Sequence, residues 1–265
     1  MIPIGLNICV LNSGSSGNST VIYTGKTSIM LDAGLSGKET VKRLNEIGLS
    51  PNQFSGILVS HGHRDHTSGV GVLARRFKIP VFLNKKTHIE ISPYVGEIPI
   101  LKSVRSGSSF DIGDIQIETF SVSHDSSDPM GFIFKSNHSR IAHITDLGNV
   151  TPAILKKIRD MDLIVIESNH DIDMLINGSY PEYLKRRILG PKGHLSNIAA
   201  ANALVEAIGS ITKAVILAHL SEDNNHPDLV HSTVHEILEE EGLGDIALTI
   251  ASRYSAIPVI NISEL

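Results

Sequence analysis

The feature that most constrains this chain is a histidine-rich segment directly after an apolar one. Residues 54–60 have the pattern of a buried strand, and residues 61–66, with the sequence HGHRDH, follow without a spacer. This segment carries four ligand-type side chains: His61, His63, Asp65 and His66. Just past a strand end, these side chains can converge on one point. Histidine nitrogen and aspartate oxygen suit Zn²⁺, Mn²⁺ or iron better than Ca²⁺. The alternative is a polar loop whose histidines are only solvated.

One loop cannot complete two metal sites, but three further ligand-type residues each follow an apolar segment. His124 follows residues 115–122, Asp146 follows residues 140–144, and His219 follows residues 214–218. Each residue taken alone is equally well explained as a polar side chain satisfied by its neighbours. Together with the first cluster, they predict a set of ligands along one rim of the sheets.

The remaining pattern favours an α/β fold made from one domain. The predicted strands cover residues 6–11, 20–23, 28–31, 54–60, 81–82, 115–122, 131–135, 140–144, 163–167, 214–219 and 246–250. The predicted helices cover residues 38–47, 70–77, 153–158, 198–208 and 229–240. Strand-rich sections with interleaved helices indicate two sheets with helices outside them. No repeat, low-complexity run or linker divides residues 1–265, so we expect a single domain.

Composition excludes several classes of protein. The chain is 41% hydrophobic and 19% charged, which is enough for a large core. A net charge of −5 argues against a strongly basic coat, although a local basic groove remains compatible with it. The single cysteine, Cys9, offers no disulfide and fits a buried strand position. With no signal peptide pattern and no long apolar run, we expect a cytoplasmic protein that does not cross a membrane.

The ligand series resembles that of the metallo-β-lactamase superfamily, and Asp32 matches the early aspartate that supports the family's ligand loop. The resemblance covers nearly the whole chain and implies a four-layer αββα sandwich. It further implies that His61, His63 and His124 hold one divalent ion. The second ion would have Asp65, His66 and His219 as ligands, with Asp146 bridging the two. Zinc or manganese is expected, with iron as a third option, and His143 is a rival ligand inside a strand.

Two divalent ions can share a hydroxide and polarise a scissile bond at neutral pH. Asp65 is placed to orient this nucleophile. Glu167 and His194 are similar in order and context to the proton relay of the phosphodiesterase branch, typified by the tRNA 3′-processing endonuclease. The alternative is a solvated glutamate at a strand end and a loop histidine before a helix. His170 competes with His194 for the role.

Three blocks, residues 13–18, 167–171 and 184–197, resemble the bacterial YycJ/WalJ/VicX family, which implies double-stranded DNA 5′-to-3′ exonuclease activity. In the first block, Ser15, Ser16 and Asn18 belong either to a plain hairpin turn or to a loop that lines the substrate site. In the third, the cations Lys185, Arg186 and Arg187 precede His194 and are expected to hold phosphates. The alternative for these cations is a solvated helix face.

The leading prediction is therefore a metal-dependent hydrolase that cleaves phosphodiester bonds in DNA. A small-molecule ester, thioester or lactam hydrolase on the same fold is the alternative. A nucleic-acid-binding regulatory protein with little turnover is a further alternative. Only a short segment separates Asp146 from Glu167, so we expect no inserted cap domain of the β-CASP kind. DNA is the expected partner, and no obligate protein partner is evident.

Overall fold

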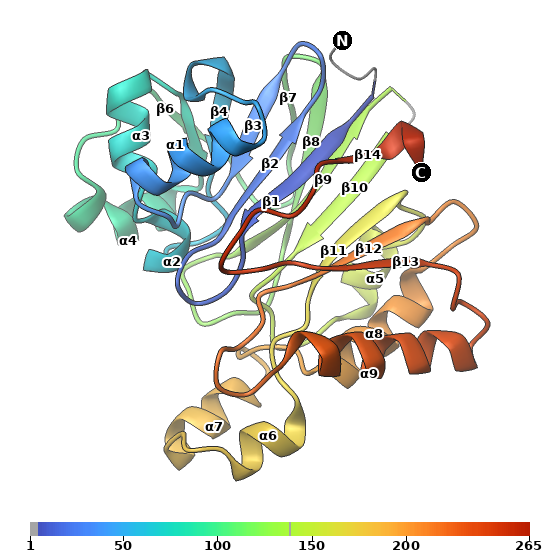
Figure 1. Cartoon of the computed structure of the whole chain (residues 1–265). Coiled ribbons are helices and arrows are strands. Elements are labelled where there is room, and N and C mark those ends of the chain that lie inside the picture. The colour runs from blue at the N-terminus through green and yellow to red at the C-terminus, as the bar shows by residue number, and fades with distance from the viewer. Residues whose placement is uncertain (1–4, 138) are drawn as a thin grey trace. The chain divides into compact units, whose positions relative to one another are not determined.

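The computed structural model describes residues 5–137 and 139–265 (Figure 1). The chain forms two compact units. The first unit comprises Met1–Ser121, Ser126–Arg140 and Ser252–Leu265, and the second comprises Val122–Asp125 and Ile141–Ala251. Each unit has its own sheet and helices, and each carries part of the ligand series predicted from the sequence.

The first unit is organised around a seven-stranded mixed sheet with the order β14-β1-β2-β3-β4-β5-β6. Its strands are β1 (Asn7–Asn12), β2 (Ser19–Tyr23), β3 (Ser28–Leu31), β4 (Phe54–Leu58), β5 (Val81–Leu83), β6 (Leu101–Ser103) and β14 (Ile260–Asn261). The strands β3, β4, β5 and β6 run parallel, so their carboxyl ends lie at one edge. The first three strands are buried along their whole length, which matches their near-continuous Ile, Val and Leu content.

Three antiparallel strands form another β layer of this unit: β7 (Ser109–Ile112), β8 (Ile115–Ser121) and β9 (Met130–Ser136). Phe110 of β7 stacks on Phe82 of β5, with ring centroids 5.7 Å apart. The helical segments of the unit are α1 (Gly37–Glu46), η1 (Pro51–Gln53), α2 (Arg64–Thr67), α3 (Val70–Phe77), α4 (Lys85–Val95) and η2 (Ile262–Glu264). Helix α1 packs against β1 and α3.

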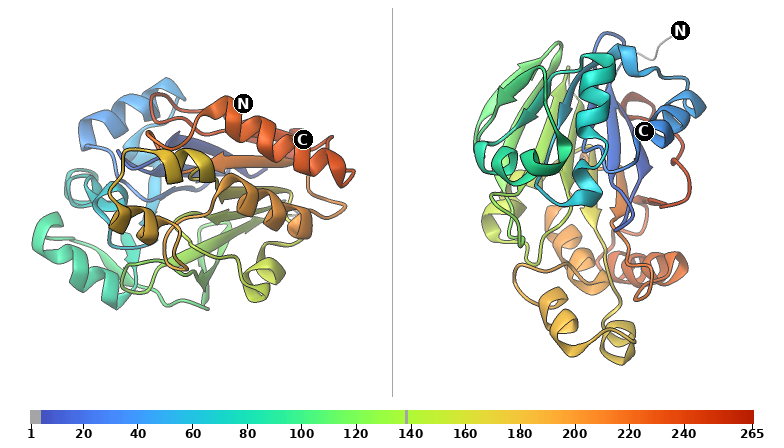
Figure 2. Two further views of the ribbon diagram at one scale, coloured as in Figure 1. Left: turned by 90° about the horizontal axis from the view of Figure 1, so that it is seen from below. Right: turned by 90° about the vertical axis from the view of Figure 1, so that its left-hand side faces the viewer.

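The second unit is built on a parallel sheet with the order β10-β11-β12-β13. Its strands are β10 (Ser139–Ile144, with residues 141–144 in this unit), β11 (Leu163–Glu167), β12 (Ala214–Ala218) and β13 (Ala247–Ile250). Its helices are α5 (Pro152–Ile158), α6 (Ile172–Asn177), α7 (Glu182–Ile188), α8 (Asn197–Ala207) and α9 (Pro227–Glu240). Helix α8 packs on α5 and α9, whereas α6 and α7 project beyond α8 and α9 (Figures 1 and 2).

The predicted α/β class is confirmed, and most predicted elements agree with the observed ones to within about two residues. Helix α4 was not predicted, because its last turn contains Pro93, a residue that normally signals a helix boundary. The short edge strands β6 and β7 and the helices α6 and α7 were not predicted either, because they are too short to show a clear hydrophobic period.

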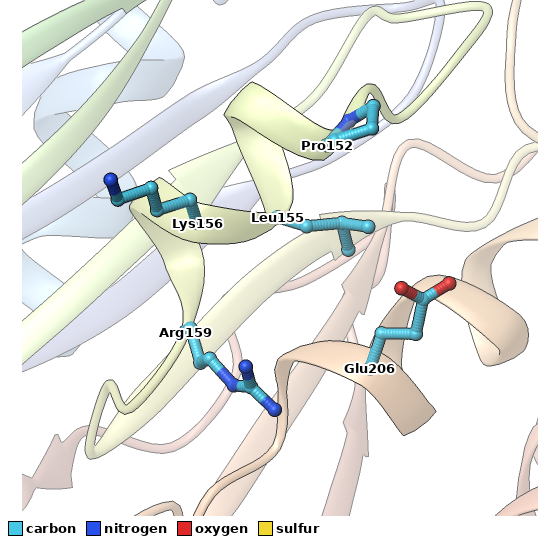
Figure 3. Close-up of a pocket in the computed structure, with 5 residues that line it drawn as sticks. All are labelled: Pro152, Leu155, Lys156, Arg159 and Glu206. Atoms are coloured by element: carbon cyan, nitrogen blue, oxygen red, sulfur yellow. The ribbon is translucent and has the colours of Figure 1, made fainter.

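Only α5 lies between β10 and β11, and α5 is seven residues long. A groove beside α5 is lined by Pro152, Leu155, Lys156, Arg159 and Glu206 (Figure 3). With no histidine among these five residues, the groove offers no counterpart to the predicted metal ligands. Within residues 5–137 and 139–265, no helix has both the length and the apolar content needed to span a membrane.

Candidate metal centre

Three loops of the first unit are interlocked by backbone hydrogen bonds around the HGHRDH segment. The Asn18 amide donates to the Asp65 carbonyl at 2.6 Å, and the Gly34 amide donates to the Asn18 carbonyl at 2.9 Å. The Ala33 amide donates to the His66 carbonyl at 2.9 Å. Gly34 has no room for a side chain, because a Cβ atom there would overlap the Asp65 backbone. The ligand loop is therefore fixed by main chain as well as by side chains.

Asp32 fixes the tautomer of His66. Its Oδ2 lies 2.7 Å from Nδ1 of His66, and its two carboxylate oxygens accept hydrogen bonds from the amide and the hydroxyl of Ser60, both at 2.8 Å. Asp32 and His66 are buried. A buried carboxylate favours a proton on Nδ1, which leaves the lone pair of Nε2 free to bind a metal. The resemblance predicts that Asp32 supports the HGHRDH segment in this way, and that role stays a prediction.

His61 and His63 bring two ring nitrogens close together. Nε2 of His61 lies 3.0 Å from Nδ1 of His63, and Nδ1 of His61 lies 2.9 Å from the Ser60 hydroxyl oxygen. Two nitrogens bound to one tetrahedral zinc at about 2.1 Å would be about 3.4 Å apart. The observed spacing is therefore close to that of two ligands on one ion.

Helix α4 supports the ligand loop from the side, which the sequence analysis did not anticipate. The Tyr94 hydroxyl donates to the Gly62 carbonyl at 2.6 Å, and the Gly62 amide donates to the Ser126 hydroxyl at 3.2 Å. Glu90 in turn accepts hydrogen bonds from the hydroxyl of Ser126 and the amide of Ser127, both at 3.2 Å. A glycine between the two predicted ligands His61 and His63 was the one sequence signal that this loop approaches other groups closely.

In the second unit, three predicted site residues lie at the carboxyl ends of parallel strands: the expected ligands Asp146 and His219 and the expected relay residue Glu167. Asp146 follows β10, Glu167 ends β11 and His219 follows β12. Asp146 and His219 both have a φ angle of 58°, as does Asp32 in the first unit. This left-handed conformation is costly for residues other than glycine and is concentrated at functional sites. Here it turns the chain sharply where each strand stops.

Glu167 connects two of the predicted site residues of the second unit, His194 and His219. Its Oε1 lies 2.7 Å from Nδ1 of His194 and 2.8 Å from Nδ1 of His219. Its Oε2 accepts hydrogen bonds from the amides of Leu147, at 3.2 Å, and Leu195, at 3.0 Å. Glu167 is fully buried, and burial alone would raise its pKa; the two histidines outweigh this and lower it to about 2. The carboxylate therefore stays ionised and orients both rings.

His124 is oriented by a main-chain acceptor. Its Nδ1 lies 3.1 Å from the Gly193 carbonyl oxygen, and its Nε2 lies 3.6 Å from Oδ1 of Asp146. That Oδ1 is also 3.4 Å from Nε2 of His219. Burial lowers the pKa of His124, which favours the neutral ring that metals require. The arrangement leaves two Nε2 atoms directed towards one aspartate oxygen.

His194 is the more exposed member of this cluster. Burial pulls its pKa down, but the Glu167 carboxylate outweighs burial and the net effect raises the pKa. Its ring lies 5.2 Å from the ring of His219, measured between centroids. Ligand atoms of the four side chains Asp146, Glu167, His194 and His219 all lie within 4.8 Å of one another.

A buried amide network, also missed from the sequence, holds the three loops that carry these groups. Asn225 and Asn197 pair side chain to side chain through two hydrogen bonds of 3.0 Å. Nδ2 of Asn225 also donates to the carbonyls of Ser168 and Asn169, and Nδ2 of Asn169 donates to the His219 carbonyl at 2.8 Å. Three asparagines spaced this far apart in sequence give no local signal.

The residues predicted to contact substrate divide into two kinds. Lys185 is largely buried by its own contacts, and its Nζ donates to the Ile176 carbonyl at 2.6 Å, so it ties α7 to the end of α6. Arg187 pairs with Asp125, at 2.5 Å between Nε and Oδ2. Asn18 is buried, and its amide nitrogen lies 3.1 Å from Oδ2 of Asp65. These three side chains have structural contacts.

Ser15, Ser16 and Arg186, in contrast, are exposed at the surface. The rival histidines are both buried: His143 lies inside β10 beside Val165 of β11, and His170 is covered almost completely. Among the described residues, neither belongs to a group of three or more ligand-type side chains within 4.8 Å.

Histidines and aspartates at the strand ends of an α/β fold are typical of metal-dependent hydrolases. Comparisons with known proteins identify the superfamily. Residues 27–220 match the family model described as the β-lactamase superfamily domain, and the chain belongs to this superfamily. The metallo-β-lactamase fold protein YhfI from Bacillus subtilis superposes with a TM-score of 0.72 at 13% identity, over 96% of this chain and 99% of that one. The predicted metallo-β-lactamase fold is confirmed.

Two named relatives are much closer in sequence. The chain is 43% identical to exodeoxyribonuclease YycJ of Bacillus anthracis, over 91% of this chain and 92% of the relative. It is 40% identical to exodeoxyribonuclease WalJ of Streptococcus pneumoniae, over 92% of each. The resemblance inferred from the three sequence blocks is thus confirmed. Membership of this superfamily, together with the histidine and aspartate clusters, implies divalent metal ions.

Proposed function

We propose that this protein is a metal-dependent exodeoxyribonuclease that degrades double-stranded DNA from the 5′ end in the cytoplasm. The proposal rests on membership of the superfamily and on two relatives named exodeoxyribonucleases at 40% and 43% identity. The chemistry of the two histidine clusters supports it independently.

The observation that carries the proposal is a shared arrangement of three histidines. In His66, His124 and His219, Nδ1 lies within 3.1 Å of an oxygen acceptor, namely Asp32, Gly193 and Glu167 respectively. A ring that donates from Nδ1 offers the lone pair of Nε2 as a ligand. Three histidines with Nδ1 held by an oxygen acceptor and Nε2 available as a ligand support divalent metal binding over the alternative of merely solvated histidines.

We propose that these clusters together hold two divalent ions, zinc or manganese. One would be bound by His61, His63 and His124, and the other by Asp65, His66 and His219, with Asp146 shared. When bound, such ions lower the pKa of water and polarise the phosphodiester group. The donor set of imidazole nitrogen and carboxylate oxygen fits both metals.

The protein's own proton donor is His194. Its Nδ1 is held 2.7 Å from the Glu167 carboxylate, so the proton it can release is the one on Nε2. The raised pKa keeps more of the ring protonated near neutral pH. As the P–O bond breaks, the Nε2 proton passes to the departing oxygen, and Glu167 stabilises the charged ring before transfer.

The test is degradation of end-labelled linear double-stranded DNA, with Mn²⁺ and Zn²⁺ supplied separately. We expect ordered loss of nucleotides from the 5′ end. Asp65→Ala should lower the rate on the order of 10³-fold, because metal catalysis supplies several kcal/mol. Asp111→Ala, at an exposed strand residue, is the matched control and should leave the rate unchanged.

Absence of degradation with either ion, in protein shown to hold two metals, would contradict the nuclease proposal. Hydrolysis of a small ester or thioester by the same sample would then favour the alternative predicted from the sequence. Degradation by wild type and Asp65→Ala at equal rates would instead reject the assigned site.

A further inference from the structure

An aromatic side chain is exposed on α7, in a chain that has few aromatics. Only 5% of residues are aromatic and none is tryptophan, yet Tyr183 is 74% exposed. No hydrogen bond to the Tyr183 side chain is found among the described residues. A large ring left in water on a projecting helix has no packing role in the fold. Exposure alone is not unusual, since Tyr254 is 79% exposed, and what sets Tyr183 apart is the pair of arginines beside it.

Two arginines share the helix face with Tyr183. Arg186 and Arg187 follow at spacings of three and four residues, which places all three on one side of α7. Lys185 is set apart from them by its contact with the Ile176 carbonyl. We refer to Tyr183, Arg186 and Arg187 as the α7 face.

The α7 face is continuous with the metal-ligand cluster of the second unit. Nε of Arg187 pairs with Oδ2 of Asp125, the residue directly after His124, while the Arg187 side chain remains 54% exposed. The segment that follows α7 also reaches the cluster, because the Gly193 carbonyl accepts from His124 and His194 is next in the chain. A strand of DNA leaving this cluster along α7 would meet Arg187 first and Tyr183 last.

We propose that the α7 face binds a single-stranded stretch of the DNA substrate, with a base stacked on Tyr183 and phosphates contacted by Arg186 and Arg187. This inference rests on the proposed function and deepens it. A flat ring beside cations is the pattern by which proteins hold single strands without sequence preference. Bases inside a duplex are already stacked on each other, so the ring selects strands with free bases.

Charge supports a stacking contact over a purely electrostatic one. The whole chain has a net charge of −5, and the α7 face supplies two cations. Two phosphate contacts on a single strand predict a slope of about −1.4 for log affinity against log salt concentration. Such a shallow slope distinguishes this surface from the broad basic tracts of proteins that bind mainly through phosphates.

The experiment is fluorescence anisotropy with the metal-loaded protein and phosphorothioate-linked DNA, which resists cleavage. One probe is a blunt duplex, and the other is the same duplex with a single-stranded extension at its 5′ end. We expect Tyr183→Ala to weaken binding of the extended probe about 5- to 50-fold and to change blunt-duplex binding less than about twofold. Tyr183→Phe should retain binding, because the ring remains.

Tyr254→Ala is the matched control, because Tyr254 is 79% exposed and lies in a loop far from α7 in sequence. It should bind both probes as wild type does. Equal affinity of Tyr183→Ala and wild type for the extended probe would overturn the inference. So would equal weakening of both probes, which would show that the ring does not select single strands over duplex.

Two further outcomes are distinguishable. If Tyr183→Ala converts a dimer to a monomer and leaves DNA affinity intact, the α7 face contacts a second copy of the chain, and the inference is wrong. Failure of wild type to degrade DNA rejects the proposed function. Degradation by wild type with unaltered binding in Tyr183→Ala rejects only the role of the α7 face.

Discussion

The two histidine clusters carry similar side chains, but different contacts hold them in place. In the first unit, His61, His63, Asp65 and His66 come from six consecutive residues, and backbone hydrogen bonds between three loops hold their segment. In the second unit, His124, Asp146, Glu167, His194 and His219 come from five separate segments. There a single carboxylate, Glu167, orients two rings and two backbone amides.

The difference shows where each cluster is vulnerable. A loop fixed by its main chain tolerates the loss of one side chain, because the remaining hydrogen bonds keep the backbone in place. A cluster tied by one buried carboxylate loses several interactions at once when that side chain is removed. Substitutions that separate stability from activity can therefore test the comparison.

The largest effect is expected for Glu167→Ala. This change leaves two ring N–H groups and two backbone amides without their acceptor in a buried site. Breaking a buried charged network of this kind costs about 3–5 kcal/mol of unfolding free energy. Urea unfolding measures it, with Asp65→Ala as the contrasting variant, since Asp65 is partly exposed. Equal stability losses in the two variants would remove the proposed difference between the clusters.

His194→Gln should lower kcat and leave the stability of the second cluster nearly unchanged. The His194 side chain is more exposed than those of Glu167 and His219, so its loss should change stability little. General acid catalysis contributes about 10²- to 10⁴-fold, and we expect kcat to fall within this range. Steady-state kinetics with metal content measured in parallel provides the test. An unchanged kcat would show that another group supplies the proton.

Gly34→Ala probes the main-chain construction of the first cluster. The added Cβ would overlap the Asp65 backbone, which no rotation of a side chain can relieve. We expect a loss of about 3 kcal/mol in unfolding free energy, at the upper end of overpacking costs. Gly107→Ala is the control for altering a glycine where nothing is nearby, although its positive φ adds a smaller strain. If Gly34→Ala is no worse than this control, the loops are not interlocked as described.

His170→Leu should reduce the pH dependence of stability in the second unit. Both ring nitrogens of His170 lack hydrogen-bond partners among the described residues, and burial lowers its pKa to about 4. The unfolded chain binds this proton from about pH 6.5 downwards, so the folded state loses stability as pH falls. Wild type should lose about 2 kcal/mol between pH 7 and pH 5 from this group. Unfolding measured at both pH values should show a smaller loss in His170→Leu; an identical loss would contradict burial of the neutral ring.

Much of the fold and part of the site were predictable, for identifiable reasons. The strands β3 and β11 were predicted at their observed bounds because their apolar runs end at clear polar residues. The first cluster could be read from sequence because its residues are neighbours in the chain. His124, Asp146 and His219 were predicted as ligands because each follows an apolar segment, and their division between two ions came only from the family resemblance.

The supporting contacts were not predictable because they join residues far apart in sequence. Tyr94 of α4 donates to the Gly62 carbonyl, and Asn225 donates to the Ser168 carbonyl, although four secondary structure elements separate these two residues in the chain. The contact of Lys185 was also not predictable: its charge predicted a phosphate contact, which stays a prediction, and nothing in the sequence indicated that its Nζ donates to the Ile176 carbonyl of α6. A charged residue in a basic run has the same sequence signature in either role.

The number of metal ions bound per chain shows whether the two histidine clusters form a metal centre. Native mass spectrometry of protein reconstituted with Zn²⁺ or Mn²⁺ should give two ions per chain for wild type. His66→Ala and His219→Ala, one from each cluster, should each lose an ion while remaining folded. Wild type that binds no ion, or variants that both keep two, would contradict the account of the clusters as a metal centre.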